Sequence, residues 1–176
     1  MEYLHICSSP LGEITLSGDG EALTGLWFQG QKYFGSTLSG EETGKSLPLF
    51  DRTEEWLDIY FSGREPGFLP PLRPRGTPFR QRVWQLLQEI PYGQTVTYGD
   101  LACRLAGETG KPASPRAVGG AVGRNPISLL IPCHRVLGAE GSLTGYAGGM
   151  ERKLRLLELE GVDTASLSVP RKGTAV

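Results

Sequence analysis

The stretch TYGDLACRLAGETGKPASPRAVGGAVGRNP, residues 97–126, predicts two short helices joined by a polar loop. Thr97 and Asp100 have the spacing of a capping box, in which two side chains satisfy backbone N–H groups at the start of a helix. We expect the helix that they begin to end at Gly107. Two short helices in this order are typical of a helix-turn-helix, although the loop between them is longer than in the tight version.

The second helix of this pair is rich in glycine. Ser114 and Pro115 begin it with a hydroxyl cap and a proline whose missing N–H costs nothing at that position. An interior glycine costs about 1 kcal/mol relative to alanine, and glycines stand at positions 119, 120 and 123. The smooth face that results allows close approach, either by a neighbouring helix or by the backbone of a partner. Arg116 lies in the first turn, where free N–H groups favour an anion, so this helix suits a phosphate backbone or a groove.

The first half of the chain is predicted to hold strands followed by one helix. Alternating residues predict antiparallel strands at 13–17 and 23–28, followed by a loop over residues 30–45. The apolar spacing of residues 47–63 predicts a helix that Gly63 stops.

Residues 63–76 are rich in proline and glycine and cannot hold a helix or a central strand. We therefore expect a linker at about 63–76 between an N-terminal α/β domain, residues 1–70, and a C-terminal domain, residues 71–176.

The second half is predicted to be mostly helical. A helix beginning after Thr77 has one apolar face made of Phe79, Val83, Leu86, Leu87 and Ile90. Near the end, residues 150–160 predict a helix with Leu154 and Leu157 inward and Gly161 as its stop, and the tail after Val162 is expected to be loosely ordered.

Charge is divided unevenly along the chain, although the formal net charge is only −1. Residues 1–70 carry 4 Lys/Arg and 11 Asp/Glu, whereas residues 71–176 carry 14 and 8. A basic second half suggests contact with a polyanion, and an uneven surface without such a partner is the alternative. No apolar stretch approaches a membrane span, and the N-terminus lacks the pattern of a signal peptide, so we expect an intracellular protein. Three widely spaced cysteines, Cys7, Cys103 and Cys133, imply no disulfide framework.

The segment IPCHRVLG, residues 131–138, places a cysteine beside a histidine. Pro132 can begin a helical turn, which would put Cys133 near unpaired N–H groups that lower the pKa of a thiol. Adjacent side chains diverge, so we expect His134 to reach Cys133 only through a bridging water. A histidine base also needs a carboxylate behind it, and Glu158 and Glu160 are the candidates.

Four other interpretations of this cysteine compete. It could be a plain buried thiol, or a zinc ligand with His5, Cys7 and His134, although the spacing does not fit a zinc motif. A thiol–disulfide exchanger would need a second cysteine nearby, as in Cys-x-x-Cys, and none is present. A cysteine hydrolase, with Cys133, His134 and Asn125 as its residues, stays open.

The segment IPCHRVLG, followed by GSLTGYAGG and RKLRLLELEG, closely resembles the O6-alkylguanine-DNA alkyltransferases, also called methylated-DNA–protein-cysteine methyltransferases. The resemblance continues upstream through TPFRQRVW, IPYGQTVTYGDLA and RAVGGAVGRNP, and covers residues 77–161 strongly. The first half matches weakly, mainly in SPLGEITLSGDGEALTGLWF. The resemblance implies an α/β (α+β) fold, with a small ribonuclease H-like antiparallel-sheet support domain and a helical, winged helix-turn-helix-like C-terminal domain.

The resemblance also implies a DNA repair reaction. In this family a cysteine attacks the alkyl carbon on O6 of a damaged guanine in one SN2 step, and the protein is consumed. Cys133 matches the nucleophile, His134 the residue that takes its proton through water, and Glu160 the carboxylate partner. Asn125 matches the residue that orders this network, and Tyr98 a hydroxyl donor to the guanine ring.

Further positions match the substrate and DNA contacts of the family. The backbone carbonyl of Val136 matches an acceptor for the exocyclic amine of guanine. The pocket loop matches at Tyr146, Ala147 and Gly148, where the middle position is often serine. Arg116 matches the side chain that enters the base stack after the target nucleotide leaves it. The other residues expected at the DNA are Thr97, Ala117, Gly119, Gly120 and Arg124.

The expected partner is therefore double-stranded DNA containing alkylated guanine, bound through its minor groove by a monomer. We expect no cofactor, no metal and no membrane contact, and a cytoplasmic location, or a nuclear one in a eukaryote. A related alkyltransferase-like group senses lesions without transfer, but it replaces the cysteine, commonly with tryptophan. The presence of Cys133 argues against that reading.

Overall fold

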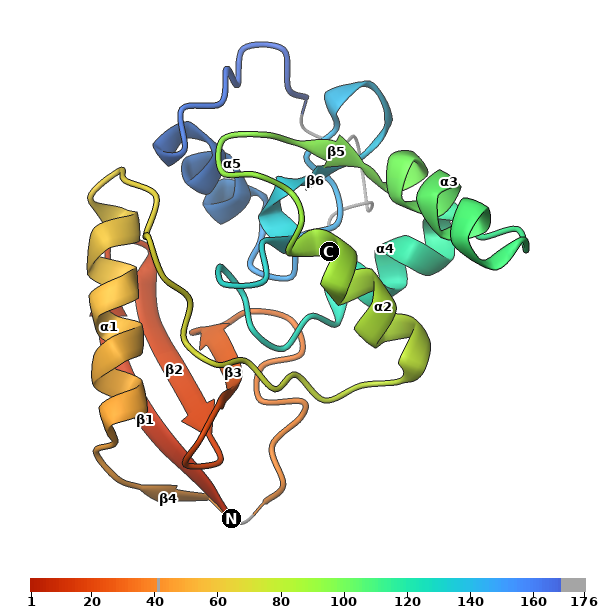
Figure 1. Cartoon of the computed structure of the whole chain (residues 1–176). Helices are drawn as coiled ribbons and strands as arrows, with labels where there is room; N and C mark the ends of the chain where they lie inside the picture. Colours follow the sequence, from red (N-terminus) through yellow and green to blue (C-terminus); the bar gives the residue numbers. More distant parts are fainter. Residues whose placement is uncertain (41, 169–176) are drawn as a thin grey trace. The chain divides into compact units, whose positions relative to one another are not determined.

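The computed structural model describes residues 1–40 and 42–168 (Figure 1). The chain forms two compact units. The first contains Met1–Arg75 together with Pro126–Leu130, and the second contains Gly76–Asn125 and the chain from Ile131 onward. Within the described residues, no helix has the length and apolar character needed to cross a membrane.

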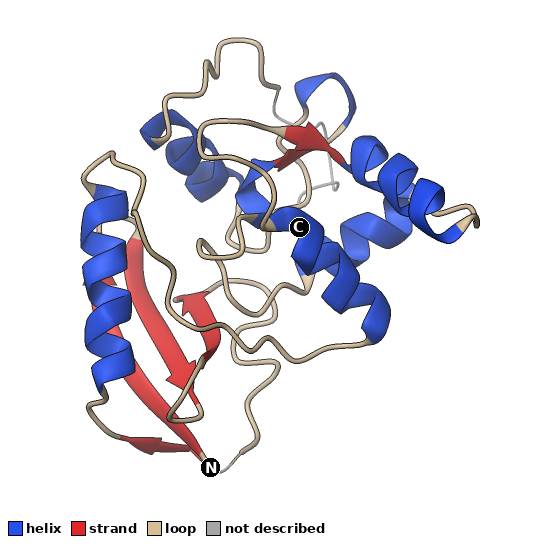
Figure 2. Ribbon diagram, viewed as in Figure 1, coloured by secondary structure: helices blue, strands red, loops and turns tan. Residues whose placement is uncertain are grey.

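A four-stranded sheet forms the centre of the first unit, in the order β3-β2-β1-β4 (Figure 2). Its strands are β1 (Glu2–Ser9), β2 (Gly12–Gly18), β3 (Leu23–Phe28) and β4 (Glu42–Gly44). The antiparallel pairing of β2 with β3 confirms the two predicted strands. The prediction missed β1, which pairs antiparallel with β2, and it was wrong to treat residues 30–45 as loop throughout, because β4 lies there and pairs parallel with β1.

Helix α1 (Pro48–Phe61) covers one face of this sheet, packed on β1 and β2 (Figure 1). It buries Phe50 and Leu57, as the apolar spacing predicted, and also Trp56, whereas Phe61, the third residue with that spacing, is only half-buried. Gly63 follows the helix with φ 86°, a left-handed conformation that suits glycine and ends the helix.

A short segment far along the chain returns to the first unit. The backbone N–H of Leu26 donates to the carbonyl of Pro126 (2.8 Å), and that of Ser128 donates to the carbonyl of Leu26 (3.2 Å). Nothing in the sequence pattern of residues 126–130 indicated this pairing beside β3.

The second unit combines helices with a small parallel sheet. Its helices are α2 (Pro78–Leu87), α3 (Tyr98–Thr109), α4 (Pro115–Gly123) and α5 (Met150–Leu159), with short 3-10 helices η1 (Cys133–Arg135) and η2 (Ala139–Gly141). Strands β5 (Val96–Thr97) and β6 (Val136–Leu137) pair in parallel. Helix α4 packs against both α2 and α3, and the indole N–H of Trp84 donates to the carbonyl of Ala121 (2.8 Å). The observed architecture confirms the predicted fold class.

The capping box that opens α3 is present in both directions. Asp100 N–H donates to Thr97 Oγ1 (3.0 Å), and Thr97 N–H donates to Asp100 Oδ2 (2.9 Å). The predicted end of this helix is wrong, because the chain stays helical through Gly107 to Thr109. Gly110, with φ 71°, supplies the left-handed conformation that ends it.

Two expectations about packing need correction. Phe79 is 41% exposed, whereas the other predicted members of the apolar face of α2 are buried. The part of the tail that the structure describes is held, because Leu143 N–H donates to the carbonyl of Ser168 (2.8 Å) and Leu167 packs on the cluster around Leu137. Leu154 also packs on that cluster, and residues 169–176 lie outside the described chain.

Candidate active site

Cys133 begins the 3-10 helix η1, directly after Pro132, as the helical-turn prediction required. Its side chain is only 4% exposed. Burial raises the pKa of the Cys133 thiol, whereas the backbone N–H groups of Cys133 and His134 act to lower it. Burial wins, so the expectation of a lowered thiol pKa is wrong for this state, and the thiol is neutral at rest.

Asn125 brings the end of α4 to the cysteine. Its amide Nδ2 donates to the carbonyl of Ile131 (2.8 Å), and its side chain also hydrogen-bonds to Cys133. The bond to Ile131 fixes the chain two residues before the thiol, and the bond to sulfur favours the thiolate.

His134 and Glu160 form a buried pair, with Nε2 2.5 Å from Oε2. Burial lowers the pKa of His134 in spite of this carboxylate, so the ring is neutral at rest. With Nε2 donating to Glu160, Nδ1 is the basic nitrogen of that neutral ring. The other candidate, Glu158, is exposed, and its carboxylate accepts a long hydrogen bond from the Thr164 hydroxyl (3.4 Å).

Arg135 completes this network and was not predicted. Its Nε donates to Glu160 Oε1 (2.8 Å), and its Nη1 donates to the carbonyl of Ile90 (2.7 Å). The N–H of Gly93 also donates to Glu160 Oε1 (3.0 Å). Burial would raise the pKa of Glu160, but His134 and Arg135 together hold it down to about 2.

Tyr98 lies at the N-terminus of α3 and is buried. Its hydroxyl donates to the carbonyl of Thr144 (2.9 Å). Burial, with a smaller contribution from the Cys133 charge, raises the pKa of Tyr98 far above its usual value, so this hydroxyl keeps its proton. Gly145 packs against it with φ 94°, and a Cβ there would lie 2.0 Å from the hydroxyl oxygen.

Lys153, on α5, is a second functional candidate that the sequence reasoning missed. It is 0% exposed, and its Nζ donates to the carbonyls of Thr144 (3.0 Å) and Val136. Burial lowers the pKa of Lys153 to about 8. The carbonyl of Val136, predicted to accept from guanine, therefore already accepts one hydrogen bond.

A pocket of about 450 Å³ opens beside this network. It brings together four of the predicted residues, Thr97, Tyr98, Arg116 and Gly119, and its other lining residues are Gly99, Pro115, Ala139, Thr144 and Gly145. The predicted substrate residues Val136, Tyr146, Ala147 and Gly148 do not line it, and all four are buried. The ring of Tyr146 instead packs edge-on against His134, with centroids 6.4 Å apart.

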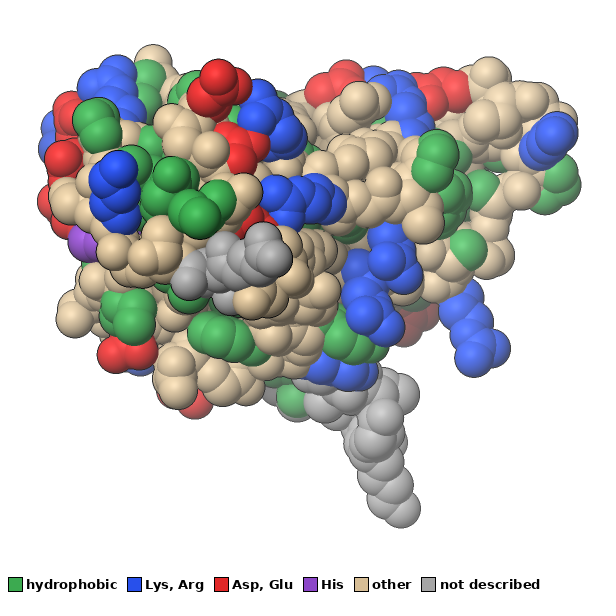
Figure 3. Space-filling model, turned by 90° about the horizontal axis from the view of Figure 1, so that it is seen from below, with side chains coloured by type: hydrophobic (Ala, Val, Ile, Leu, Met, Phe, Trp, Pro, Cys, Tyr) green, Lys and Arg blue, Asp and Glu red, His purple; other side chains and the backbone are tan. Residues whose placement is uncertain are grey.

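The N-terminal half of α4 presents small, exposed residues. Arg116, Ala117 and Gly120 are exposed, and Gly119 is half-buried with the ring of Tyr98 3.7 Å from where its Cβ would be. Arg124 follows the helix and is half-buried. Figure 3 shows a group of exposed lysine and arginine side chains on one face of the molecule.

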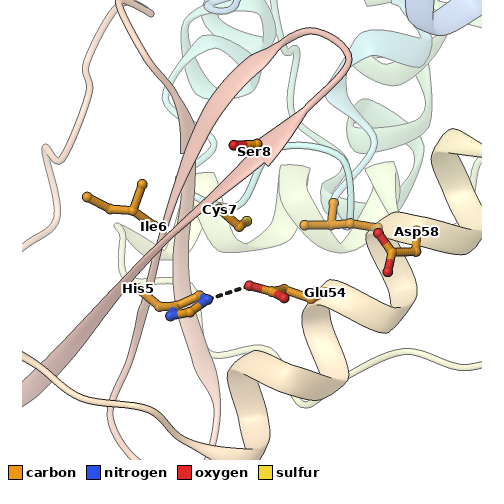
Figure 4. Close-up of a pocket in the computed structure, with 7 residues that line it drawn as sticks. His5, Ile6, Cys7, Ser8, Glu54 and Asp58 are labelled. Carbon is orange, nitrogen blue, oxygen red and sulfur yellow. Dashed lines mark hydrogen bonds and ion pairs between the residues drawn. The ribbon is translucent and has the colours of Figure 1, made fainter.

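A separate pocket of about 300 Å³ lies in the first unit, between β1 and α1 (Figure 4). There His5 pairs with Glu54 and stacks on Phe50, with ring centroids 5.4 Å apart. Burial, aided by Glu54 and Asp58, raises the pKa of Cys7 to about 11, so this thiol is poorly nucleophilic. Among residues 1–40 and 42–168, no three His, Cys, Asp or Glu side chains are placed to hold a metal ion, so the considered set of His5, Cys7, Cys133 and His134 is not assembled.

Both halves of the chain match models of one protein family. Residues 3–74 match the family model described as 6-O-methylguanine DNA methyltransferase, ribonuclease-like domain, and residues 78–162 match its DNA binding domain. The methylated-DNA–protein-cysteine methyltransferase of Haemophilus influenzae is 43% identical over 90% of this chain and 86% of its own length.

Solved structures agree with this assignment. The crystal structure of Mycobacterium tuberculosis OGT in complex with DNA has a TM-score of 0.78 and 44% identity, covering 90% of this chain and 92% of that one. The O6-methylguanine methyltransferase of the same organism has a TM-score of 0.76 and 44% identity, covering 91% and 93%. The resemblance noted in the sequence is thereby confirmed, and the chain belongs to the methylated-DNA–protein-cysteine methyltransferase family.

Proposed function

We propose that this protein repairs DNA by moving the alkyl group of O6-alkylguanine onto Cys133, once per molecule. The observation that carries the proposal is the buried thiol of Cys133, which directly precedes the neutral His134. That histidine is hydrogen-bonded to the charged carboxylate of Glu160. A sulfur–carbon bond forms, the carbon–O6 bond breaks, and guanine is restored. Nothing in the site can remove the thioether, so each molecule acts once.

The thiol must first lose its proton. In our proposal His134 takes it, through a bridging water, at Nδ1. Glu160 then stabilises the imidazolium, because its low pKa keeps it ionised at neutral pH. Asn125 and the N–H groups of η1 stabilise the thiolate that remains.

The departing oxygen needs a hydrogen-bond donor. Tyr98 lines the pocket and keeps its proton, so its hydroxyl can donate a hydrogen bond to the guanine as negative charge develops on O6, and the released guanine anion is then protonated by water. The hydroxyl would exchange its resting bond to Thr144 for one to the base. We place Val136 beside the base, with Tyr146, Ala147 and Gly148 in the buried layer behind the pocket lining.

DNA is the proposed partner, since a relative with 44% identity was solved in complex with DNA. We propose that α4 lies in the minor groove, where its small exposed residues permit close approach and carry little sequence readout. The DNA contacts would come from Ala117, Gly119 and Gly120 on α4, from Arg124 directly after it, and from Thr97 at the start of α3. Arg116 would enter the stack as the alkylated nucleotide leaves it. We further propose that the protein acts as a monomer inside the cell.

The test is to mix the protein with duplex DNA containing O6-methylguanine and to weigh the protein. We expect a stable gain of one methyl group that is absent in Cys133→Ser and retained in Cys103→Ser, whose thiol is exposed. Binding without a change of mass would instead support a lesion sensor. Repeated turnover of an ester or amide would support the cysteine hydrolase.

A further inference from the structure

We infer that residues 5–9 of β1, called the open edge below, form a docking site for a basic, extended segment of a partner protein that adds to the sheet as a further strand. These residues belong to the first unit, and the proposed alkyl-transfer network does not use them. The inference therefore goes beyond the proposed function and does not depend on it.

Strand β1 is paired on both sides only at its beginning. Residues 3–9 pair with β2, whereas β4 pairs with residues 2–4 alone. In the part of the chain that the structure describes, no other strand or isolated bridge meets residues 5–9. Such an edge presents unpaired N–H and C=O groups, which are a template for another strand.

The hairpin between β1 and β2 fixes which backbone groups face the open edge. Ser9 pairs with Gly12 across a two-residue turn. Because Pro10 in that turn has no N–H, this pair forms only if its two residues exchange both of their own hydrogen bonds. Successive residues of a strand point these groups to opposite sides, and the register continues without a bulge. Ile6 and Ser8 therefore present their N–H and C=O groups to the open edge.

The open edge lacks the features with which proteins usually protect an exposed strand, namely charged side chains, proline and bulges. Its sequence, HICSS, contains no Lys, Arg, Asp, Glu or Pro, and its register with β2 is continuous. Ile6 is 61% exposed and points away from α1 (Figure 4). An unprotected edge beside an exposed isoleucine suits a partner strand that also supplies apolar contact.

Two carboxylates on α1 give this site its charge. Glu54 and Asp58 line the pocket of about 300 Å³ between β1 and α1. The Glu54 side chain is 40% exposed although it pairs with His5, and Asp58 is exposed. Among residues 1–40 and 42–168, neither carboxylate forms an ion pair with Lys or Arg. Cationic side chains on the partner would complement both.

The spacing of the two carboxylates matches that of an added strand. His5 pairs with Glu54, and Cys7, two residues later, lies close enough to Asp58 for that charge to raise its pKa, so β1 and α1 advance together. Four residues of helix rise about 6 Å, and two residues of strand span about 6.6 Å. Side chains at alternate positions of an added strand can therefore reach both carboxylates, and those between them fall beside Ile6.

The partner segment that fits has Lys or Arg at alternate positions and apolar residues between them. A second copy of this chain fits poorly, because two open edges paired in one sheet would place both α1 helices on the same face. The carboxylates of both copies would then gather without a cation. DNA, a polyanion, is disfavoured by the same charge.

The experiment measures the binding of a dye-labelled synthetic peptide to the full chain by fluorescence anisotropy. The probe is Lys-Val-Lys-Val-Lys with neutral flanking residues. Its controls are Glu-Val-Glu-Val-Glu, which reverses the charge, and the Lys-Val peptide N-methylated at every residue, which cannot donate backbone hydrogen bonds. We expect the probe to bind at least about tenfold more tightly than either control. Equal affinity of the probe and either control would overturn the inference.

Variants of the protein test the backbone and the charge of the site. Ser8→Pro removes an outward N–H without breaking the pairing with β2, so it should weaken binding about tenfold. Glu54→Gln/Asp58→Asn should weaken binding about fivefold, as expected for two exposed ion pairs. Asp51→Asn/Glu55→Gln removes two exposed carboxylates of the same helix outside the pocket and should bind like the parent. Thermal unfolding checks that each variant is folded, and equal binding by the two double variants would contradict the inference.

Hydrogen exchange, followed by NMR in the unsubstituted protein, needs no variant. The amides of Ile6 and Ser8 should exchange quickly in the free protein and slowly with the probe bound, whereas those of His5 and Cys7, which bond to β2, should stay protected throughout. Unchanged exchange at Ile6 and Ser8 would count against the site. Protection of both amides that grows with protein concentration, in the absence of peptide, would assign the open edge to a second copy and overturn the inference.

Discussion

The carboxylate of Glu160 accepts hydrogen bonds from His134 and Arg135, the two residues that follow the candidate nucleophile. Its Oε2 lies 2.5 Å from His134 Nε2, and its Oε1 lies 2.8 Å from Arg135 Nε. One buried carboxylate thus fixes the tautomer of the histidine and the position of the arginine. Both the chemistry of the site and the acid stability of the second unit depend on it.

Glu160→Gln should slow alkyl transfer at least about tenfold, because a neutral amide stabilises the His134 imidazolium poorly. Rapid-mixing measurement of benzyl transfer from O6-benzylguanine at pH 7 checks this. Glu158→Gln on the same helix is the control, since Glu158 is exposed. Equal rates for the two variants would argue against the role of Glu160.

The lowered pKa of Glu160 predicts how the free energy of unfolding depends on pH. The folded pKa of Glu160 is about 2, below its ordinary value of 4.5. The stabilisation is therefore present above pH 4.5 and is lost as the pH falls toward 2, with a total of roughly 3 kcal/mol. Urea unfolding between pH 3 and 7 should show that the free energy of unfolding falls more steeply with acid in the parent than in Glu160→Gln. Parallel curves for the two proteins would contradict this prediction.

Tyr98→Phe should show whether Tyr98 acts on the leaving oxygen or on the thiol. Loss of the hydroxyl should slow transfer from O6-benzylguanine about tenfold, the cost expected for one lost hydrogen bond to a charged leaving oxygen. Modification of Cys133 by iodoacetamide needs no such donor and should change little. Comparable losses in both reactions would show that Tyr98 acts through the packing of the thiol instead.

Much of the local structure around the candidate site was predictable because it lies in local motifs. Pro132 sets up the turn at Cys133, and the caps at Thr97 and Ser114 fix where α3 and α4 begin. These signals act over a few residues, so the sequence contains them in full. The pairing of His134 with Glu160 came from family resemblance, since spacing alone left Glu158 as an equal candidate.

The missed features depend on contacts between distant segments. Strand β1 gains its partners from β2 and β4, and neither pairing leaves a strong alternation in residues 2–9. Lys153 did leave a signal that was not used. Together with Met150, Leu154 and Leu157 it has the i, i+3, i+4, i+7 spacing of an inward helix face, where a charged residue calls for a functional explanation.

Gly145→Ala tests the contact that confines Tyr98. A Cβ at this position would lie 2.0 Å from the tyrosine oxygen, in a backbone with φ 94°. Gly149 is a matched control, because it has φ 93° and nothing within 4 Å of its Cβ position. Both alanine variants should lose about 1–3 kcal/mol of stability to backbone strain.

Only the Gly145 variant should also lose benzyl transfer activity, since only there is Tyr98 displaced. Thermal unfolding and transfer rates, measured on both variants, separate the two effects. Equal activity in the two variants would mean that the hydroxyl of Tyr98 does not need this position.

Arg116→Ala distinguishes base flipping from chemistry. The side chain is exposed at the start of α4 and lines the pocket without taking part in the thiol network. Removing a group that fills the vacated stack should slow repair of duplex DNA about 10- to 100-fold, because extrusion of a nucleotide costs a few kcal/mol. Transfer from free O6-benzylguanine, which needs no extrusion, should stay within about twofold of the parent. Arg64→Ala removes an exposed arginine of the first unit and controls for lost positive charge. If Arg116→Ala slowed both substrates equally, the side chain would belong to the pocket and another group would have to hold the stack open.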